Sequence, residues 1–323
     1  MVLILNEADV DALLDMQSTI TTLEAAFREQ SAGRILLPNR QVIQEPGSQA
    51  IVRIMPASAS KLKALGLKVL LGSAGKRRQG ATYFAILLFD PDDASLLAII
   101  SAGRLTQLRT GGASAVATKH LARSSAHTIG VVGTGVQGYG QLEGVAAVTH
   151  PTKCLVYDVS ETSIRMMIEK ARTKLGIELK QASSLDELCG VDVLCTSTTS
   201  TEPIIFWEKL QPGIHINAIG SNVPNRRELH PTVLLNSKVF VDRKEQALNE
   251  SGDLIIAIKD GIFNPDNIKG EICDVLTKKI PGRTSDSDVT LFKSVGIAIE
   301  DVAVARAVYD NAMKKGAGKD LPL

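Results

Sequence analysis

The sequence predicts an α/β protein in which a parallel-sheet domain is inserted into a discontinuous α+β domain. Its 323 residues exceed the usual span of one hydrophobic core. From Thr128 onward, short apolar strands alternate with helical segments, a pattern typical of a parallel sheet. We expect the helical stretch at 297–313, which is rich in Ala and Val, to return from that sheet to the first domain. The first domain would then be built from both ends of the chain.

The composition is that of an ordinary globular protein, with 44% hydrophobic and 22% charged residues. Lys and Arg number 36 against 35 Asp and Glu, and the net charge is +1. A chain this close to neutrality creates no field that attracts nucleic acid or an anionic membrane. We therefore expect neither as a partner.

Targeting and metal signals are also missing from the sequence. The four cysteines and five histidines lack the spacing of a metal site, and the cysteines are too few for a disulfide scaffold. The first residues lack the basic leader of a signal peptide, and no apolar run is long enough to span a bilayer. We expect a cytoplasmic protein without a bound metal.

The first hundred residues carry both helix and strand signals. Asn6 and Asp9 are typical of a helix start, and apolar residues recur at helical spacing up to Gly33, so one amphipathic helix is predicted. Alternation of apolar and polar residues follows. Two apolar runs at 82–89 and 96–100 flank an Asp-Pro-Asp-Asp turn, which predicts a hairpin. This part of the chain is therefore α+β.

Helical spacing returns at 104–121, and five short apolar strands follow. These strands are predicted at 129–132, 154–157, 191–195, 214–219 and 239–241. We place the domain boundaries so that 1–119 and 300–323 form the α+β domain, and 120–299 form the parallel-sheet domain.

A glycine-rich turn directly follows the first of these strands. It consists of Gly133, Thr134, Gly135, Val136, Gln137 and Gly138, and it leads into a helical segment. In a Rossmann domain the first glycine permits the tight turn, the second lets the backbone approach a pyrophosphate, and the third allows close packing of helix on strand. The N–H groups of the helix N-terminus then bind the phosphates. The order strand, turn, helix therefore predicts a Rossmann dinucleotide-binding domain.

Asp158 stands about 20 residues after Gly138, at the end of the next strand, where a carboxylate binds the ribose 2′-hydroxyl. The same carboxylate repels a 2′-phosphate, so we expect NAD(H) to be preferred over NADP(H), although Arg165 opposes that preference. A second interpretation remains open, in which Asp158 only caps the following helix.

Because the Rossmann domain supplies the cofactor, the first domain is expected to supply the substrate ligands. Four cations stand in or beside its apolar stretches, namely Arg40, Arg53, Lys68 and Arg109. Three guanidinium groups and one ammonium group can converge on a carboxylate. From the residues alone, ion pairs for the arginines and a snorkelling side chain for Lys68 remain the simpler interpretations.

Several segments of the chain together resemble the ornithine cyclodeaminase and mu-crystallin family, which also contains alanine dehydrogenases and ketimine reductases. The resemblance extends over nearly the whole chain. The segments that carry it are RIMPA at 53–57, GLK at 66–68, LRTG at 108–111, the glycine turn at 133–138, PGIHINAIG at 212–220 and FKSVG at 292–296.

The resemblance implies a Rossmann domain inserted into a discontinuous dimerisation and substrate domain, and therefore a homodimer. It implies that Lys68 and Arg109, as catalytic residues, surround the substrate together with Arg40 or Arg53. It also implies that the dinucleotide lies near the Thr82 neighbourhood, the loop of Thr196, Ser197 and Thr198, and the segment from Ser294 to Gly296, with Gly296 also assigned to the substrate.

Asn222 occupies the place where ornithine cyclodeaminases carry an Asp that handles the amines of ornithine. An amide is uncharged and a poor base, so as a substrate ligand Asn222 argues against cyclodeamination. The resemblance thus implies NAD(P)H-dependent reduction of the C=N bond of a small imino acid, such as 1-pyrroline-2-carboxylate, to an L-amino acid. Three alternatives remain: an alanine dehydrogenase, an ornithine cyclodeaminase, and a non-catalytic binding protein like mu-crystallin.

Overall fold

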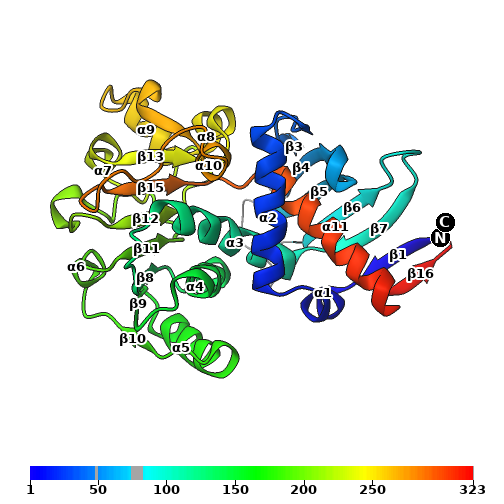
Figure 1. Ribbon diagram of the computed structural model, residues 1–323, viewed down its shortest axis with the longest axis horizontal. Coiled ribbons are helices and arrows are strands. Elements are labelled where there is room, and N and C mark those ends of the chain that lie inside the picture. The colour runs from blue at the N-terminus through cyan, green and yellow to red at the C-terminus, as the bar shows by residue number, and fades with distance from the viewer. Residues whose placement is uncertain (48–49, 74–82, 323) are drawn as a thin grey trace. The chain divides into compact units, whose positions relative to one another are not determined.

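The computed structural model describes residues 1–47, 50–73 and 83–322. It divides into two compact units (Figure 1), of which unit 1 comprises Met1–Arg109 and Ile297–Leu323, and unit 2 comprises Thr110–Gly296. Helix α3 (Gly103–Leu121) begins in unit 1 and ends in unit 2. The predicted fold class is confirmed, and the boundaries at 119/120 and 299/300 stay a prediction.

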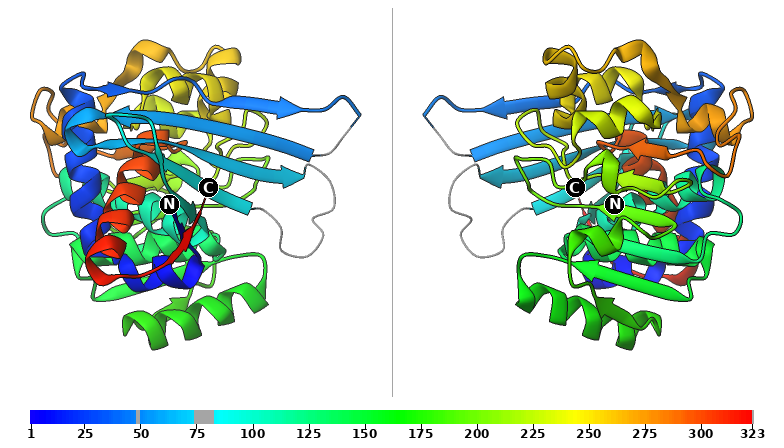
Figure 2. Two further views of the ribbon diagram at one scale, coloured as in Figure 1. Left: turned by 90° about the vertical axis from the view of Figure 1, so that its right-hand side faces the viewer. Right: turned by 90° about the vertical axis from the view of Figure 1, so that its left-hand side faces the viewer.

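Unit 1 is a mixed sheet covered by helices. Its described strands follow the order β16-β1-β7-β6-β5-β4-β2, with β3 paired to β4. Figure 2 shows these strands side by side, with both chain termini on the neighbouring strands β1 and β16. The elements are β1 (Val2–Leu5), α1 (Glu7–Leu13), α2 (Met16–Ser31), β2 (Ile35–Leu36), β3 (Gln41–Gln44), β4 (Ala50–Ala59), η1 (Ser60–Leu62), β5 (Ala64–Ser73), β6 (Tyr83–Phe89), β7 (Leu96–Ser101), α11 (Ala298–Lys315) and β16 (Lys319–Leu321).

The prediction of one helix reaching from Asn6 to Gly33 is wrong, because the chain forms α1 and α2 instead. Asn6 and Asp9 form a capping box at the start of α1, as their spacing predicts. Leu14 is then extended, with φ −132° and ψ 128°, and Asp15 opens a second capping box with Ser18. A new cap inside an apolar pattern therefore divides the helix.

The last long helix returns to unit 1, as expected for the discontinuous domain. Helix α11 packs against α2 and against β4, β5 and β6 (Figure 1). A Cβ on Gly66 would lie 2.6 Å from the Leu87 carbonyl oxygen and 3.3 Å from Val302 Cγ1. The absence of a side chain at Gly66 thus lets α11 lie close to the sheet. The predicted hairpin is confirmed for β6 and β7, which pair antiparallel, whereas Thr82 lies outside the described residues.

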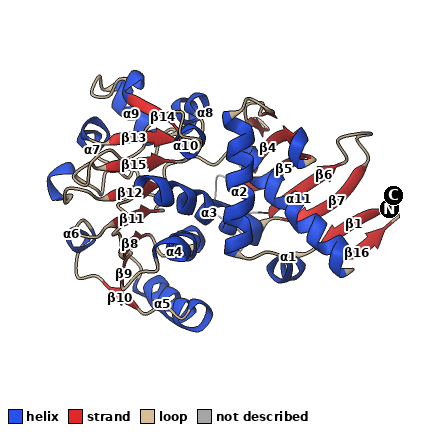
Figure 3. Cartoon of the chain, viewed as in Figure 1, coloured by secondary structure: helices blue, strands red, loops and turns tan. Residues whose placement is uncertain are grey.

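Unit 2 is a parallel sheet with helices on both sides (Figure 3). Its strands follow the order β10-β9-β8-β11-β12-β15-β13-β14. The elements are β8 (Thr128–Val132), α4 (Val136–Thr149), β9 (Lys153–Tyr157), α5 (Glu161–Leu175), β10 (Leu179–Gln181), α6 (Leu185–Leu188), β11 (Val193–Thr196), η2 (Trp207–Lys209), β12 (His215–Ala218), α7 (Pro231–Asn236), β13 (Lys238–Val241), α8 (Lys244–Glu250), α9 (Gly252–Lys259), η3 (Pro265–Asn267), β14 (Ile268–Glu271), α10 (Ile272–Leu276) and β15 (Thr290–Lys293).

Two apolar clusters fill the two faces of this sheet. Leu194 belongs to one cluster, and its neighbours Val193 and Cys195 belong to the other, because successive residues of a strand face opposite sides. Both faces are buried, which explains why these strands are almost continuously apolar. The strand order reverses between β8 and β11, and ligands of open α/β sheets bind at such a switch point.

Candidate active site

The glycine turn of unit 2 leaves space for a pyrophosphate. Gly133 has φ 91°, and a Cβ there would lie 2.7 Å from the Ser197 carbonyl oxygen. A Cβ on Gly138 would lie 1.8 Å from the Gly133 carbonyl oxygen, so only glycine lets α4 pack against the turn. A Cβ on Gly135, by contrast, would meet no described heavy atom within 4 Å. The backbone at Gly135 is therefore open to a ligand, as a dinucleotide requires.

The start of α4 adds to this fit. Gly135 is its N-cap and has no side chain with which to bond the N–H groups of the first turn. The 14-residue helix follows the turn directly, and its N-terminal dipole favours an anion. Of the other turn residues, Thr134 is buried, Gln137 is half-buried and Val136 is exposed.

Asp158 directly follows β9 and braces the glycine turn. Its Oδ2 accepts hydrogen bonds from Thr134 N at 2.7 Å and from Thr134 Oγ1 at 3.0 Å. Its Oδ1 accepts a hydrogen bond from Ser160 N at 2.9 Å. The N-cap of α5 is Ser160 itself, whose Oγ bonds Ser163 N, so the alternative that Asp158 is merely that cap is wrong.

The predicted loop of Thr196, Ser197 and Thr198 lies beside the same turn. Ser197 N donates a hydrogen bond to Val132 O at 2.9 Å, and Ser197 Oγ donates to Gly133 O at 3.0 Å. Strands β8, β11, β12 and β15 are parallel neighbours, so their carboxyl ends meet at one edge of the sheet. The predicted segment from Ser294 to Gly296 follows β15 and is placed at this edge too.

A buried carboxylate that the sequence analysis missed ties two of these loops together. Glu228 is fully buried, and its Oε1 accepts a hydrogen bond from Thr198 N at 2.6 Å. Its Oε2 accepts from Thr196 Oγ1 and from Gly220 N, each at 2.8 Å. Burial raises the pKa of Glu228, and the nearby Lys293 opposes that rise. In the sequence, Glu228 stands in a polar loop and has no feature that would single it out.

A second missed carboxylate shapes the segment after β15. Asp242 Oδ2 accepts hydrogen bonds from Ser294 Oγ at 2.9 Å, Val295 N at 2.8 Å and Gly296 N at 2.7 Å. Gly296 has φ 77°, a conformation that glycine adopts at little cost. Asp242 follows β13, the strand beside β15, so its role depends on the order of strands in the sheet.

Lys68 and Arg109, the two residues expected to be catalytic, lie together in unit 1. Lys68 is on β5 and only 1% exposed, so the snorkelling interpretation is wrong. Its Nζ donates a hydrogen bond to Asp301 Oδ1 at 2.9 Å. Arg109, on α3, donates from Nε to the same Asp301 oxygen at 2.9 Å and from Nη1 to Glu300 Oε2 at 2.7 Å.

The surroundings of Lys68 change its acidity. Burial lowers the pKa of Lys68 to about 8, with Arg109 and Arg40 acting in the same direction and Asp301 opposing them. Burial would raise the pKa of Asp301, but Arg109 and Lys68 hold it below its usual value. The Lys68 ammonium also lies over the ring of Phe84, with Nζ 5.1 Å from the ring centroid. An ammonium of this acidity can give up a proton near neutral pH.

The other predicted substrate ligands differ in how they relate to this cluster. Arg40 is half-buried and close enough to affect the charge of Lys68. Arg53 is half-buried on β4, where the register pairs Met55 with Lys68 and therefore places Arg53 on the same face of the sheet. Asn222 belongs to unit 2, beyond the end of β12, and is exposed.

Glu300 and Asp301 were missed by the sequence analysis, although the sequence carries a signal for them. They are two consecutive carboxylates in the first turn of helix α11, directly before the apolar residues 302–305, and both are fully buried. At that position acidic residues are usually explained by the helix dipole. Their apolar neighbours are the sign that these carboxylates face the interior and need cationic partners.

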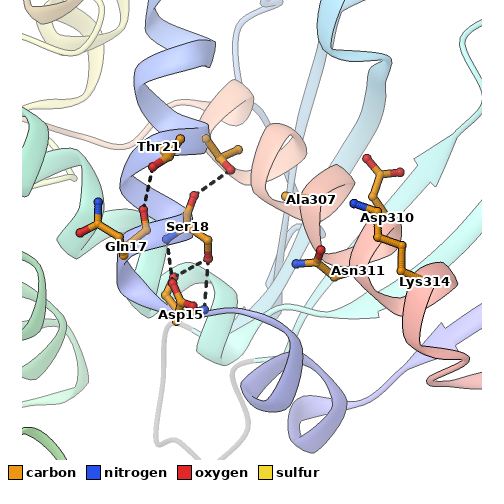
Figure 4. Close-up of a pocket in the computed structure, with 9 residues that line it drawn as sticks. Asp15, Gln17, Ser18, Thr21, Ala307, Asp310, Asn311 and Lys314 are labelled. Atoms are coloured by element: carbon orange, nitrogen blue, oxygen red, sulfur yellow. Dashed lines mark hydrogen bonds between the residues drawn. The ribbon is translucent and has the colours of Figure 1, made fainter.

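An open hollow between α2 and α11 contains none of the predicted site residues (Figure 4). Several of its side chains bond within their own helix, such as Ser18 with Asp15 and Thr21 with Gln17. It is lined by Asp15, Gln17, Ser18, Thr21, Thr22, Ala307, Asp310, Asn311 and Lys314. We assign it no role in the reaction.

Metal-ligand clusters and membrane-spanning helices are both absent from the part of the chain that the structure describes. No group of three or more His, Cys, Asp or Glu side chains has the arrangement of a metal site there. Among the same residues, no helix combines the length and the apolar character needed to cross a bilayer.

A Rossmann sheet with an open glycine turn, together with a second domain, defines the class as a dinucleotide-dependent oxidoreductase. The chain belongs to the ornithine cyclodeaminase/mu-crystallin family, whose model matches residues 2–316. The resemblance noted from the sequence is thereby confirmed.

Three similar proteins span nearly the whole chain. A Δ1-pyrroline-2-carboxylate reductase of Bacillus cereus is 35% identical over 321 residues, which cover 98% of each chain. The Thermococcus litoralis Δ1-pyrroline-2-carboxylate reductase, solved with NADH and L-proline, is 35% identical, with a TM-score of 0.95 over 99% of this chain and 100% of that one. An archaeal alanine dehydrogenase dimer with bound NAD is 32% identical, with a TM-score of 0.93 over 99% of both chains.

Proposed function

We propose that the protein reduces the C=N bond of a small cyclic imino acid, such as 1-pyrroline-2-carboxylate, with NADH. The observation that carries this proposal is the buried cluster in which Lys68 and Arg109 share Asp301. A buried ammonium of lowered pKa beside a guanidinium suits a substrate that needs both a proton and a carboxylate ligand. Relatives that act on this imino acid, one of them solved with NADH and proline, support the choice of substrate.

Reduction of a C=N bond consumes one hydride and one proton and yields a CH–NH group. When bound, NADH supplies the hydride to the imine carbon and leaves as NAD+. In our proposal Lys68 supplies the proton to the imine nitrogen, and its amine is recharged from solvent after product leaves. The product is an L-amino acid, which is L-proline for the five-membered ring.

The carboxylate of the substrate needs more than Arg109. Arg109 already uses Nε for Asp301 and Nη1 for Glu300, so each of its two forks, Nε with Nη2 and Nη1 with Nη2, has one nitrogen engaged. We infer that Nη2 provides one contact and that Arg40 or Arg53 provides the second. Arg53 lies on the sheet face of Lys68, and Arg40 is near enough to influence its charge, which supports either choice.

We assign dinucleotide binding to the turn from Gly133 to Gly138, the loop from Thr196 to Thr198, and Ser294. The open space at Gly135 and the uncapped start of α4 would hold the pyrophosphate. We expect NAD(H) to be preferred over NADP(H), because the Asp158 carboxylate follows β9 at the ribose position and would repel a 2′-phosphate. Its bonds to Thr134 hold that negative charge in place.

Alanine dehydrogenase is the nearest alternative, because the chain is similar to such an enzyme and the same cluster could reduce the imine formed from pyruvate and ammonia. Ornithine cyclodeaminase ranks below it, because Asn222 offers no carboxylate for the amines of ornithine. A purely binding role fits less well, because burial of four charged groups, Lys68, Arg109, Glu300 and Asp301, costs free energy that a simple binding site need not spend.

We further propose a cytoplasmic homodimer formed through unit 1. Several apolar side chains of unit 1 are largely exposed, and those on strands β2 and β3, which are both bonded to β4, are Leu36 at 71%, Val42 at 57% and Ile43 at 55%. Strand β3, which carries two of them, is exposed along its whole length. Exposed apolar side chains gathered on a strand favour association, and the similar alanine dehydrogenase is a dimer.

Purified protein should be assayed with 1-pyrroline-2-carboxylate and NADH or NADPH, with pyruvate plus ammonia, and with ornithine plus NAD+. We expect rapid NADH consumption and L-proline formation from the imino acid, and a higher kcat/KM with NADH than with NADPH. Faster turnover of pyruvate plus ammonia would favour alanine dehydrogenase. Release of proline and ammonia from ornithine, with the cyclic imine ignored, would overturn the proposal in favour of a cyclodeaminase.

A further inference from the structure

One oxygen atom joins the two cations of the unit 1 cluster. Asp301 Oδ1 accepts hydrogen bonds from Lys68 Nζ and from Arg109 Nε, both at 2.9 Å. Asp301 is fully buried, and its other oxygen, Oδ2, has no hydrogen-bond partner among the described residues. A buried carboxylate oxygen without a partner is costly. Asp301 thus places both of its hydrogen bonds on Oδ1, although sharing them between its two oxygens would leave neither oxygen without a partner.

We propose that Asp301 is a positioning residue of the reaction, which fixes the Lys68 ammonium relative to the Arg109 guanidinium and keeps that ammonium charged. This inference rests on the proposed function, in which Lys68 delivers the proton and Arg109 holds the carboxylate. Because Lys68 Nζ and Arg109 Nε both bond Asp301 Oδ1, the distance between these two nitrogens cannot exceed the sum of the two hydrogen-bond lengths. An imino acid carries its nitrogen and its carboxylate on the same carbon, so a short fixed separation matches its shape.

Lysine needs such an anchor more than arginine does. Its ammonium is a point charge on a flexible four-carbon stem, whereas a guanidinium is a rigid planar group. Arg109 has a second anchor in Glu300, whereas Lys68 forms its ion pair with Asp301. Loss of Asp301 would therefore release Lys68 while Arg109 keeps Glu300.

The charges around Lys68 explain why Asp301 is needed to keep its ammonium charged. Arg109 on α3 and Arg40, which precedes β3, repel its ammonium, while Phe84 on β6 faces it with an aromatic ring. Glu300 on α11 bonds Arg109, and Asp301 on the same helix attracts Lys68 directly. Burial and both arginines thus favour the neutral amine, and Asp301 is the carboxylate that opposes them.

The test compares Asp301→Asn with Glu300→Gln. The second substitution removes the negatively charged Glu300 partner of Arg109 but leaves the ion pair of Lys68 with Asp301. The pH profile of kcat/KM for the imino acid is measured in both variants and in the wild type. Asp301→Asn should move the alkaline limb to lower pH by about 1 to 2 units, because loss of a close opposite charge shifts a pKa by that much. It should also lower kcat by about tenfold or more, because the proton donor is misplaced.

Glu300→Gln should raise KM for the imino acid and leave the alkaline limb within about 0.3 unit of the wild type, since the Lys68 ion pair remains. A purely structural role for Asp301 would not move the limb. An unmoved limb in Asp301→Asn, or an equal movement in Glu300→Gln, would overturn the inference.

Folding and the proposed function are checked separately. The rise in melting temperature caused by NADH reports whether each variant is folded, independently of turnover. If Asp301→Asn does not fold, Asp301→Glu keeps the charge but shifts the carboxylate, so a lowered kcat with an unmoved limb supports the inference, and a wild-type kcat overturns it. Normal turnover in Lys68→Met would refute the proposed function itself, whereas an inactive Lys68→Met together with a wild-type profile in Asp301→Asn would refute the positioning role alone.

Discussion

Lys68→Met is expected to remove most imino-acid reduction while the protein still folds and binds NADH. Methionine has nearly the length of lysine and packs well in an apolar interior, but its side chain has no acidic proton to donate. A positioned acid or base contributes about 10² to 10⁴ in rate, so kcat should fall by that factor. Affinity for NADH should not change, because the proposed dinucleotide site belongs to unit 2 and Lys68 to unit 1.

The same substitution should also change how stability depends on pH. Burial lowers the pKa of Lys68 from 10.5 to about 8. At about 1.4 kcal/mol per pKa unit, the folded state loses about 3 kcal/mol by burying the charged form. Between pH 8 and 10.5 the unfolded chain holds more protons on this group than the folded one, so the free energy of unfolding rises with pH.

The penalty is therefore complete below about pH 8 and gone above about pH 10.5, and Lys68→Met lacks it at every pH. Denaturant unfolding of both proteins across this range should show the wild type gaining about 3 kcal/mol relative to the variant. A constant difference between the two would mean that the pKa of Lys68 is the same in the folded and the unfolded chain, so that its ion pair fully offsets the cost of burying the charge.

Activity provides the second readout of the same ionisation. The wild type should lose about tenfold in kcat/KM for each pH unit above about 8, because only the protonated amine serves as the acid. The residual rate of Lys68→Met, measured under the same conditions, reports any ionisation of the substrate itself. A wild-type profile that stays flat up to about pH 10, or near-normal turnover in the variant, would refute the assignment of Lys68.

Three further substitutions test other parts of the proposal. Gly135→Asp should fold, because a Cβ at this position meets no described atom within 4 Å, but its carboxylate should repel the pyrophosphate and abolish the NADH-induced rise in melting temperature. Gly135→Asn is the uncharged control. An unchanged rise in the Asp variant would contradict the assignment of the turn to the dinucleotide. Asp158→Arg should raise the ratio of kcat/KM with NADPH to kcat/KM with NADH by about tenfold or more. A wild type that already prefers NADPH would show that Asp158 only bonds Thr134 and does not select the cofactor. Arg109→Leu should raise KM for the imino acid. It should also lower the free energy of unfolding by about 3–5 kcal/mol, because the buried carboxylates of Glu300 and Asp301 lose their guanidinium partner. An unchanged free energy of unfolding in denaturant would show that these carboxylates are protonated.

Much of the fold could be predicted because local patterns report local structure. The capping box of Asn6 and Asp9, the alternation that produces the β6 and β7 hairpin, and the apolar strands of unit 2 all depend on residues within a few positions of each other. The glycine turn is only partly local. A Cβ on Gly138 would meet the carbonyl oxygen of Gly133 within the turn, whereas a Cβ on Gly133 would meet Ser197, which follows the neighbouring strand β11. For the local features the sequence contains its own explanation.

The prediction was less complete where order in space differs from order in the chain. Strand β15, which was not predicted, lies between β12 and β13 in the sheet although it follows both in the sequence. That insertion brings Ser294 and Gly296 beside Asp242. No spacing within the sequence indicates it, because a parallel strand finds its place through packing and distant hydrogen bonds.

The sequence by itself determined which cations deserved attention, since Lys68 and Arg109 are charges within apolar surroundings. Only the tertiary structure decided what they do to each other. Asp301 bonds Lys68 across 233 positions and Arg109 across 192, although its place in the first turn of helix α11 allowed an entirely local explanation by the helix dipole. Long-range electrostatic partners depend on how helix α11 packs against strand β5, because a charge acts through distance in space and burial rather than through separation along the chain.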